Sequence, residues 1–246
     1  MGRSGVLRAA VLYCHGLGAS STSGIAVAAK NLVESRQLLF KSVQYRDAGS
    51  VTRVWSVDRW LEDVLKEIDH SDRPIILLGN SAGCHCVLRA ALLRRETVIA
   101  LILLSPGVGL CFQNYARTVF PHSISDLLAG KNVLHPAALN GAPALVNLQC
   151  LQRFVDTCVS NSMRSIPIHR PVRIIHGDED KVVPLRNVRS FVKKLESEDV
   201  VLEVLRGVGH HIPMTRKFEA IFDSLLDALS ARSRTNIPQP PYASNF

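Results

Sequence analysis

Short apolar runs recur along the chain, separated by longer segments in which apolar residues return every three or four positions. The runs cover residues 11–14, 75–79, 98–104, 172–176 and 200–205, and the more polar segment 38–44 is predicted as a further strand. Short runs that are apolar on both faces predict strands of a parallel sheet, because the helices that connect parallel strands cover both faces of the sheet.

The segments between these runs have the periodicity of amphipathic helices. Helices are predicted at about 24–36, beyond the turn at 79–83 with Val87, Leu88, Ala91 and Leu92 on one side, and at about 185–195. A further helix places on one face Val57, Trp60, Leu61, Val64, Leu65 and Ile68. The last helix places on its inner face Phe218, Ile221, Phe222, Leu225, Leu226 and Leu229. The alternation predicts an α/β protein, with a mostly parallel central sheet and helices on both faces.

The alternation lapses between about residues 108 and 169. A connection of this length exceeds an ordinary loop, so we predict a lid insertion in a single domain that covers residues 1–234. Its apolar residues either line an acyl pocket or pack the lid onto the core; they are Phe112, Tyr115, Val119, Phe120, Leu127, Leu128, Val133 and Leu134. The tail at 235–246, rich in Pro, Ser and Asn, is predicted to be disordered.

Composition narrows the range of partners. The chain has 246 residues, of which 47% are hydrophobic and 20% charged, which is typical of a compact globular protein. The net charge of +8 is interpreted as a solvated positive surface; the alternative is that it favours anionic substrates or surfaces, including peripheral contact with a membrane. The apolar run at 100–104 is too short to span a bilayer. The basic residues are scattered and match no recognition module, so no nucleic-acid partner is expected.

The six cysteines have no spacing typical of a disulfide scaffold. Cys84, His85 and Cys86 are adjacent on a predicted helix and face different directions, and no second ligand pair completes a metal site. We therefore expect packed free thiols, no metal and no cofactor. Free thiols indicate a reducing, cytoplasmic location; the alternative is mitochondrial, because the first 33 residues contain Arg3 and Arg8 but no acid.

The pentapeptide Gly79-Asn80-Ser81-Ala82-Gly83 follows directly on the apolar run at 75–79. A buried strand that ends in G-x-S-x-G and continues into a helix predicts the sharp turn called a nucleophile elbow. Its strained apex requires neighbours without bulky side chains, which accounts for the two glycines. The turn would expose the hydroxyl of Ser81 and direct the N–H of Ala82 at the group that the serine attacks.

A serine nucleophile needs a histidine base and a carboxylate that orients the base. In an open α/β sheet both are expected in loops at the carboxyl ends of later strands. The run at 172–176 is followed by Asp178 and Asp180, and the run at 200–205 by His210 and His211. The order along the chain is therefore Ser, Asp, His. The acid is either Asp178 or Asp180, and the base is either His210 or His211.

With these motifs the chain resembles the α/β-hydrolase superfamily over nearly its whole length, from the His-Gly turn at 15–16 to the last helix. The superfamily pattern G-x-x-D-x-x-V-P falls on Gly177, Asp180, Val183 and Pro184, and the pattern G-x-G-H ends at His210. The surroundings of Ser81 resemble those of the small esterase and acyl-protein thioesterase branch, one group of which acts on acyl glucuronides and S-palmitoyl proteins. The β-hairpin that begins many members is not expected, because the His-Gly turn comes early.

The resemblance implies an α/β-hydrolase fold and a serine hydrolase that cleaves a small-molecule or acyl-protein ester or thioester. Ser81 would attack the acyl carbonyl, His210 would transfer the proton and Asp180 would orient His210. The N–H groups of Leu17 and Ala82 would bind the oxyanion. Alternatives are a palmitoyl-protein depalmitoylase and a hydrolase-fold binding protein without turnover, although the complete Ser-Asp-His set argues against the latter.

Other polar residues have simpler interpretations. His15 is expected to support its turn by hydrogen bonding, and His85 to pack on its helix. Arg117, Arg153 and Arg164 are expected to be solvated surface charges rather than contacts for an anionic substrate.

Overall fold

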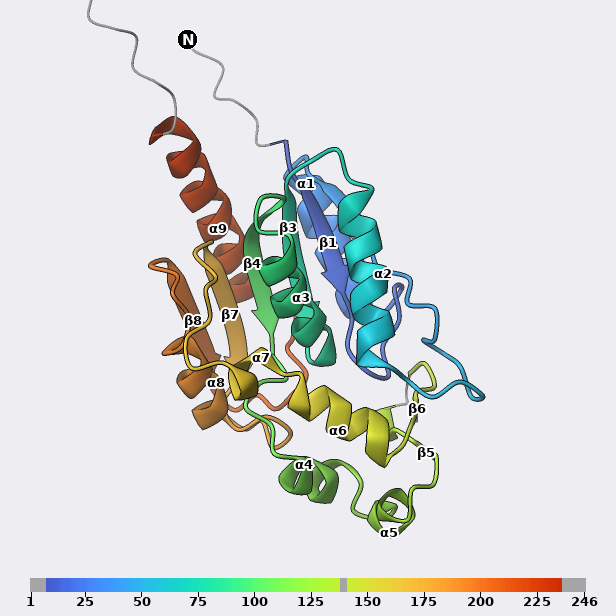
Figure 1. Cartoon of the computed structure of the whole chain (residues 1–246). Coiled ribbons are helices and arrows are strands. Elements are labelled where there is room, and N and C mark those ends of the chain that lie inside the picture. The colour runs from blue at the N-terminus through green and yellow to red at the C-terminus, as the bar shows by residue number, and fades with distance from the viewer. Residues whose placement is uncertain (1–7, 138–140, 236–246) are drawn as a thin grey trace, which may run out of the picture.

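A computed structural model describes residues 8–137 and 141–235. In these residues six strands form one sheet in the order β2-β1-β3-β4-β7-β8, and every neighbouring pair is parallel. The strands are β1 (Ala10–Cys14), β2 (Leu39–Ser42), β3 (Ile75–Asn80), β4 (Val98–Leu104), β7 (Val172–Gly177) and β8 (Val200–Leu205). The predicted α/β class is confirmed, and the carboxyl ends of β1, β3, β7 and β8 meet at one edge (Figure 1).

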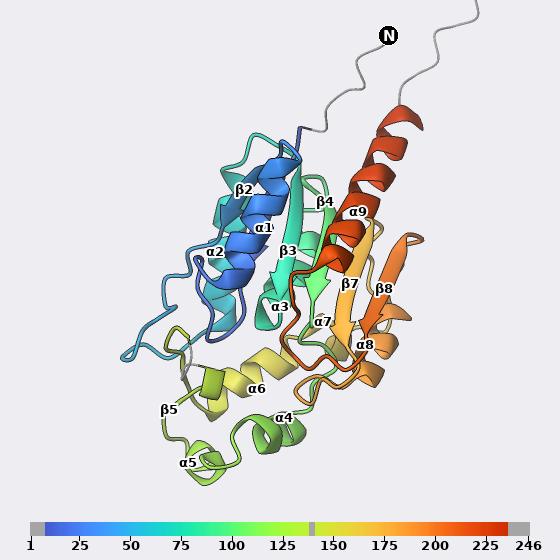
Figure 2. The ribbon, with the colours of Figure 1, turned by 180° about the vertical axis from the view of Figure 1, so that it is seen from behind.

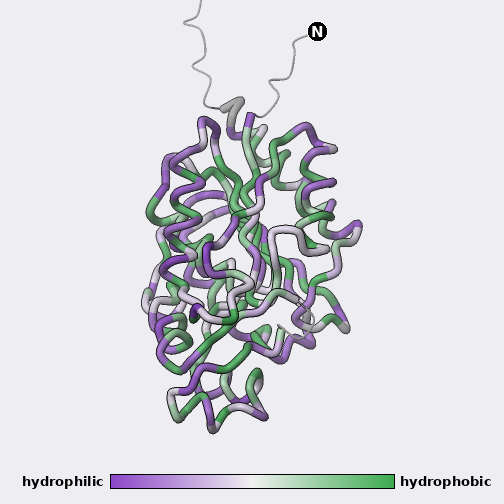
Figure 3. The backbone as a smooth tube through the Cα atoms, turned by 90° about the vertical axis from the view of Figure 1, so that its right-hand side faces the viewer, coloured by the Kyte–Doolittle hydropathy of each residue, from purple (hydrophilic) through white to green (hydrophobic). Residues whose placement is uncertain are grey.

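Helices cover both faces of the sheet, as predicted. On one face lie α2 (Val57–Asp69), α3 (Ala82–Leu93) and α8 (Leu185–Val192) (Figure 1). On the other lie α1 (Gly24–Ser35) and α9 (Arg216–Thr235) (Figure 2). Each face has its own apolar core, because alternate residues of a strand point to opposite sides. In Figure 3 hydrophobic positions run through the interior and hydrophilic positions gather on the outer turns.

The connection between β4 and β7 folds across the carboxyl edge of the sheet (Figures 1 and 2). It contains α4 (Phe112–Val119), α5 (Ile124–Leu128), α6 (Leu148–Asp156), α7 (Val159–Ser162) and the antiparallel pair β5 (Val133–Leu134) and β6 (Leu145–Val146). Phe112, Tyr115, Phe120 and Leu127 are buried in the core shared with α2, α3 and α8. Val119 and Val133 are half-buried, whereas Leu128 and Leu134 are exposed.

Several predicted boundaries were wrong; the second strand, predicted at 38–44, covers only Leu39–Ser42. The tail was expected to begin at residue 235, but Thr235 is the last residue of α9, and residues 236–246 lie outside the described residues. The first proline after this helix is Pro238, so no residue that breaks helices stands at position 235. The helix expected to reach residue 195 ends at Val192, after which the chain turns toward β8. Within the described residues, no helix is long and apolar enough to cross a membrane.

Candidate active site

Ser81 stands at the junction of β3 and α3 with a strained backbone, at φ 51° and ψ −117°. The two flanking glycines are required by close approach as well as by strain. A Cβ on Gly79 would lie 2.9 Å from the Cα of Cys84, and a Cβ on Gly83 would overlap the carbonyl oxygen of Cys14. The turn is fixed by hydrogen bonds from the Ser81 N–H to Leu104 O and from the Gly107 N–H to Ser81 O.

Three side chains from distant parts of the chain form one hydrogen-bonded series. The Ser81 hydroxyl donates to Nε2 of His210 at 2.8 Å, and Nδ1 of His210 donates to Oδ2 of Asp180 at 2.7 Å. The side chain of Asp180 is fully buried, and that of His210 is 17% exposed. The structure therefore brings together the predicted serine, base and acid.

The carboxylate of Asp180 is held from two sides. Its Oδ1 accepts hydrogen bonds from the N–H groups of Val182 and Val183 at 2.8 and 2.9 Å, which leaves Oδ2 for His210. Burial alone would raise the pKa of Asp180, but the hydrogen bond from His210 and the N–H groups outweigh it and lower the pKa. The acid thus stays ionised opposite the imidazole.

The two competing residues lie elsewhere. Asp178 is exposed, and its Oδ1 accepts the N–H of Gly207 at 2.8 Å, which fixes the turn before His210. His211 is exposed, and its ring centroid is 6.0 Å from that of His210. The geometry thus favours Asp180 and His210 over their neighbours.

Gly177 allows the loop that carries Asp180 to contact the loop that carries His210. A Cβ at this position would overlap the carbonyl oxygen of Val208, in the turn that leads to His210. A Cβ at Gly209 would meet no heavy atom within 4 Å. Gly177→Ala is therefore expected to destabilise the fold by about 2 kcal/mol and to lower hydrolysis through displacement of His210. Gly209→Ala is the matched control and should keep both properties.

Thermal unfolding and ester hydrolysis of the two variants measure the difference. Equal behaviour of Gly177→Ala and Gly209→Ala would show that the contact between the two loops does not position His210.

The turn at 15–18 lies against the elbow. A Cβ on Gly16 would be 3.0 Å from the Cβ of Ser81 and 3.6 Å from the nitrogen of Ala82. Ala82 is the first residue of α3, so its N–H has no acceptor within the helix. Leu17 follows Gly16 directly, so the structure brings the segments of both predicted oxyanion donors to the same place.

His15 and His85 do not join the series. His15 is buried, its Nδ1 bonds to Gly16 O at 3.0 Å, and its ring packs on Tyr45. His85 is buried against Phe154, and its Nε2 donates to the hydroxyl oxygen of Thr157 at 3.2 Å, since that hydroxyl itself donates to Arg153 O. Burial lowers the pKa of His85 to about 3, so it remains neutral and packs α3 against α6.

Sequence reasoning missed two histidines near the series. His176, the residue before the last of β7, is fully buried, donates from Nε2 to Val183 O at 2.9 Å, and lies 3.6 Å from Oδ2 of Asp180. It therefore supports the loop that carries the acid, and its position directly before Gly177 was the available signal. His135 bonds to the Tyr115 hydroxyl at 3.0 Å; burial lowers its pKa to about 4, with a smaller contribution from nearby His210.

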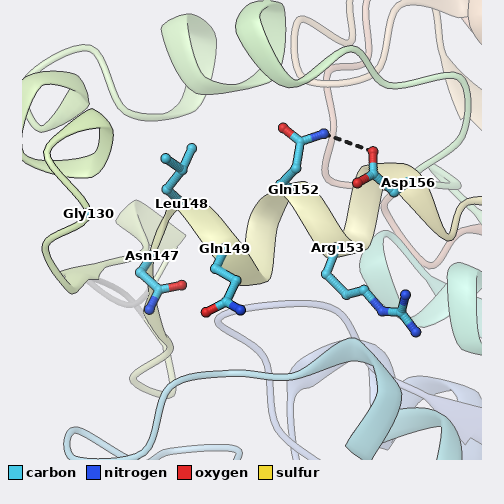
Figure 4. Close-up of a pocket in the computed structure, with 7 residues that line it drawn as sticks. All are labelled: Gly130, Asn147, Leu148, Gln149, Gln152, Arg153 and Asp156. Atoms are coloured by element: carbon cyan, nitrogen blue, oxygen red, sulfur yellow. Dashed lines mark hydrogen bonds between the residues drawn. The ribbon is translucent and has the colours of Figure 1, made fainter.

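The arginines considered as substrate contacts lie on the surface. Arg117 and Arg164 are exposed, and Arg153 pairs with Asp58 at 2.7 Å. Arg153 also borders a cleft of about 530 Å³ along the outer side of α6 (Figure 4). Its lining is Gly130, Asn147, Leu148, Gln149, Gln152, Arg153 and Asp156. The opposite side of α6 buries Phe154 beside Gly107, so this cleft is separate from Ser81.

The residues considered for metal binding are engaged in packing. The thiols of Cys84 and Cys86 are buried and donate to the carbonyl oxygens of Leu104 and Val57. In the part of the chain that the structure describes, no three His, Cys, Asp or Glu side chains converge as metal ligands would.

Comparisons with known proteins identify the family to which the chain belongs. The alpha/beta hydrolase family matches residues 11–223. Mouse palmitoyl-protein thioesterase ABHD10, mitochondrial, is 30% identical over 222 residues, which cover 86% of this chain and 73% of that protein. The human protein of the same name is 26% identical over 181 residues, 71% of this chain and 58% of its own length.

Solved structures give the same fold. The mouse ABHD10 structure superposes with a TM-score of 0.74 at 23% identity and covers 89% of this chain and 90% of its own. A monoacylglycerol lipase from Paleococcus ferrophilus has a TM-score of 0.67 at 18% identity, with 88% and 93% covered. The predicted α/β-hydrolase fold is confirmed.

Proposed function

Because the chain belongs to the alpha/beta hydrolase family, we propose that it is a serine hydrolase that cleaves a carboxylic ester or thioester through an acyl-enzyme intermediate. The observation that carries the proposal is the series from Ser81 through His210 to Asp180, with hydrogen bonds of 2.8 and 2.7 Å. This is the arrangement that activates a hydroxyl as a nucleophile.

In the proposed reaction Oγ of Ser81 attacks the acyl carbonyl while Nε2 of His210 accepts its proton. The imidazolium then donates this proton to the leaving alcohol or thiol, and the ionised Asp180 stabilises the charged ring. Water, activated by His210, hydrolyses the acyl-enzyme. The N–H groups of Ala82 and Leu17 stabilise the oxyanion, and the loss of one such donor typically costs about 3–4 kcal/mol of transition-state stabilisation.

We propose a long-chain acyl thioester as the substrate class. The support comes from the matched relatives, which are named palmitoyl-protein thioesterases. The connection between β4 and β7 is proposed to act as the lid. It reaches the oxyanion turn directly, since the N–H of Ala142 donates to Gly18 O at 2.9 Å, and it reaches the elbow through the N–H of Gly107, which donates to Ser81 O at 3.2 Å.

A fluorophosphonate probe, followed by a substrate series, tests the proposal. The folded protein is expected to be labelled at Ser81, and kcat/KM for palmitoyl-cysteine thioesters should exceed that for acetyl and butyryl esters by about tenfold or more. Absence of labelling would favour a binding protein without turnover. Labelling with a preference for short chains would retain the hydrolase and exclude the palmitoyl substrate.

The names of the relatives also support the mitochondrial alternative for the location of this chain. Fractionation of cells that express the full chain tests it, and recovery in the cytosolic fraction would contradict it.

A further inference from the structure

A run of basic residues without any acid begins directly after the proposed catalytic acid. Residues 181–195 contain five basic residues and no Asp or Glu: Lys181, Arg186, Arg189, Lys193 and Lys194. The acids that flank the run are Asp180, which is hydrogen-bonded to His210, and Glu196. Glu196 is already engaged with the Ser165 hydroxyl and His169.

Three of these cations form a stripe along α8 and its C-terminal end. Arg186, Arg189 and Lys193 follow one another at spacings of three and four residues, so they lie on one side of the helix. All three are exposed, whereas Val188 and Phe191 on the opposite side are buried in the core. Lys194 turns away from the stripe and donates to Ser160 O and Met163 O.

The stripe differs from the other charged helices because no acid neutralises it. On α2 and α9 the basic residues share the helix with acids, such as Asp58 and Asp223. Among the described residues, Arg186, Arg189 and Lys193 make no ion pair with a carboxylate. Their charge is therefore available to an external anion.

The stripe lies at the end of the molecule that holds the proposed active site. α8 begins five residues after Asp180, and both ribbon views place it beside the carboxyl ends of β7 and β8 (Figures 1 and 2). A flat surface bound by this stripe would therefore lie near the catalytic loops.

We propose that the exposed face of α8 docks on the surface of a bilayer that contains anionic lipids. Phe191 is buried and no large apolar side chain of α8 is exposed, so the face offers no aromatic platform for nucleobases and no apolar centre for a protein interface. What it offers is an extended row of like charges, which suits a surface of lipid headgroups. Docking itself does not require turnover. Its role, which is to bring the active site to acyl chains anchored in the membrane, rests on the proposed function.

Co-sedimentation with vesicles tests the docking. The full chain is mixed with one of two kinds of vesicle. One contains phosphatidylcholine alone, and the other also contains about 30 per cent phosphatidylglycerol, which is anionic and gives the vesicle a strong negative surface potential. The triple variant Arg186→Gln, Arg189→Gln, Lys193→Gln is compared with the control Lys30→Gln, Arg73→Gln, Lys131→Gln. The control positions are surface cations, each paired with an acid. Both variants lower the net charge by three, from +8 to +5.

Each basic residue at an anionic surface strengthens partitioning roughly fivefold, so loss of the stripe should weaken binding to anionic vesicles on the order of a hundredfold. The control should lose much less, and binding should fall as salt is raised. The proposal would be overturned if both variants lost vesicle binding equally, or if the unaltered chain did not bind anionic vesicles. If the chain bound a soluble polyanion but no vesicles, the stripe would instead indicate a protein or nucleic-acid partner. Hydrolysis of a water-soluble ester by the α8 variant should be unchanged, which separates failure of docking from failure of the proposed function.

Discussion

Replacement of Ser81 by alanine is expected to lower kcat for ester hydrolysis by a factor on the order of 10⁴ or more. The reason is that the Ser81 hydroxyl is the group hydrogen-bonded to Nε2 of His210, at 2.8 Å, and alanine offers no atom that forms an acyl intermediate. Steady-state hydrolysis of a p-nitrophenyl ester and labelling by a fluorophosphonate measure the loss.

Ser105→Ala is the matched control. Ser105 also follows a central strand, is fully buried and has a positive φ of 41°, but among the described residues its hydroxyl has no hydrogen-bond partner. Its replacement should leave kcat within a few-fold of the unaltered protein. If Ser81→Ala kept a tenth of the activity, or were labelled as strongly as the Ser105→Ala variant, Ser81 would not be the nucleophile.

Asp180→Asn is expected to lower kcat on the order of 10³–10⁴-fold with little change in KM, since the carboxylate acts on the base rather than on the bound substrate. The amide lacks the charge that stabilises the imidazolium, and its N–H groups oppose donation from Nδ1 of His210. A pH series of kcat for the variant and the unaltered chain is the measurement.

Asp178→Asn is the control for this prediction, because the two carboxylates stand two residues apart in the same loop. The Oδ1 of an asparagine at this position still accepts the N–H of Gly207, so activity should stay within a few-fold. A larger loss from Asp178→Asn than from Asp180→Asn would transfer the orienting role to Asp178. Circular dichroism of both variants shows whether either loss reflects unfolding.

Several features of the fold follow from patterns within short segments. β4 and β8 have the predicted bounds, and α2 buries the predicted face of Trp60, Leu61 and Val64. These predictions were correct because the spacing of apolar residues is a local property that decides which face a helix or strand buries. The elbow at Ser81 was predictable for the same reason, since a strand, two small residues and a helix are consecutive in the chain.

Local patterns did not distinguish residues that share a turn. The residue types left Asp178 and Asp180 open, and the resemblance implied Asp180; the folded loop gives the reason, because it directs Asp178 to Gly207 and Asp180 to His210. His176 likewise contacts Val183 only because the loop after β7 folds back onto the strand. In the connection after β4, Phe120 is buried and Leu128 is exposed, although both are large and apolar.

The sequence by itself determined the α/β class, the nucleophile elbow and the order Ser, Asp, His, because each depends on neighbours in the chain. The resemblance had implied Asp180 as the acid, but the tertiary structure alone decided how the loop separates Asp178 from the histidine, which apolar residues of the connection are buried, and that a serine and a histidine 129 residues apart stand at 2.8 Å. Those outcomes depend on contacts between distant segments, and the parallel sheet creates these contacts by bringing the carboxyl ends of β3, β7 and β8 to one edge.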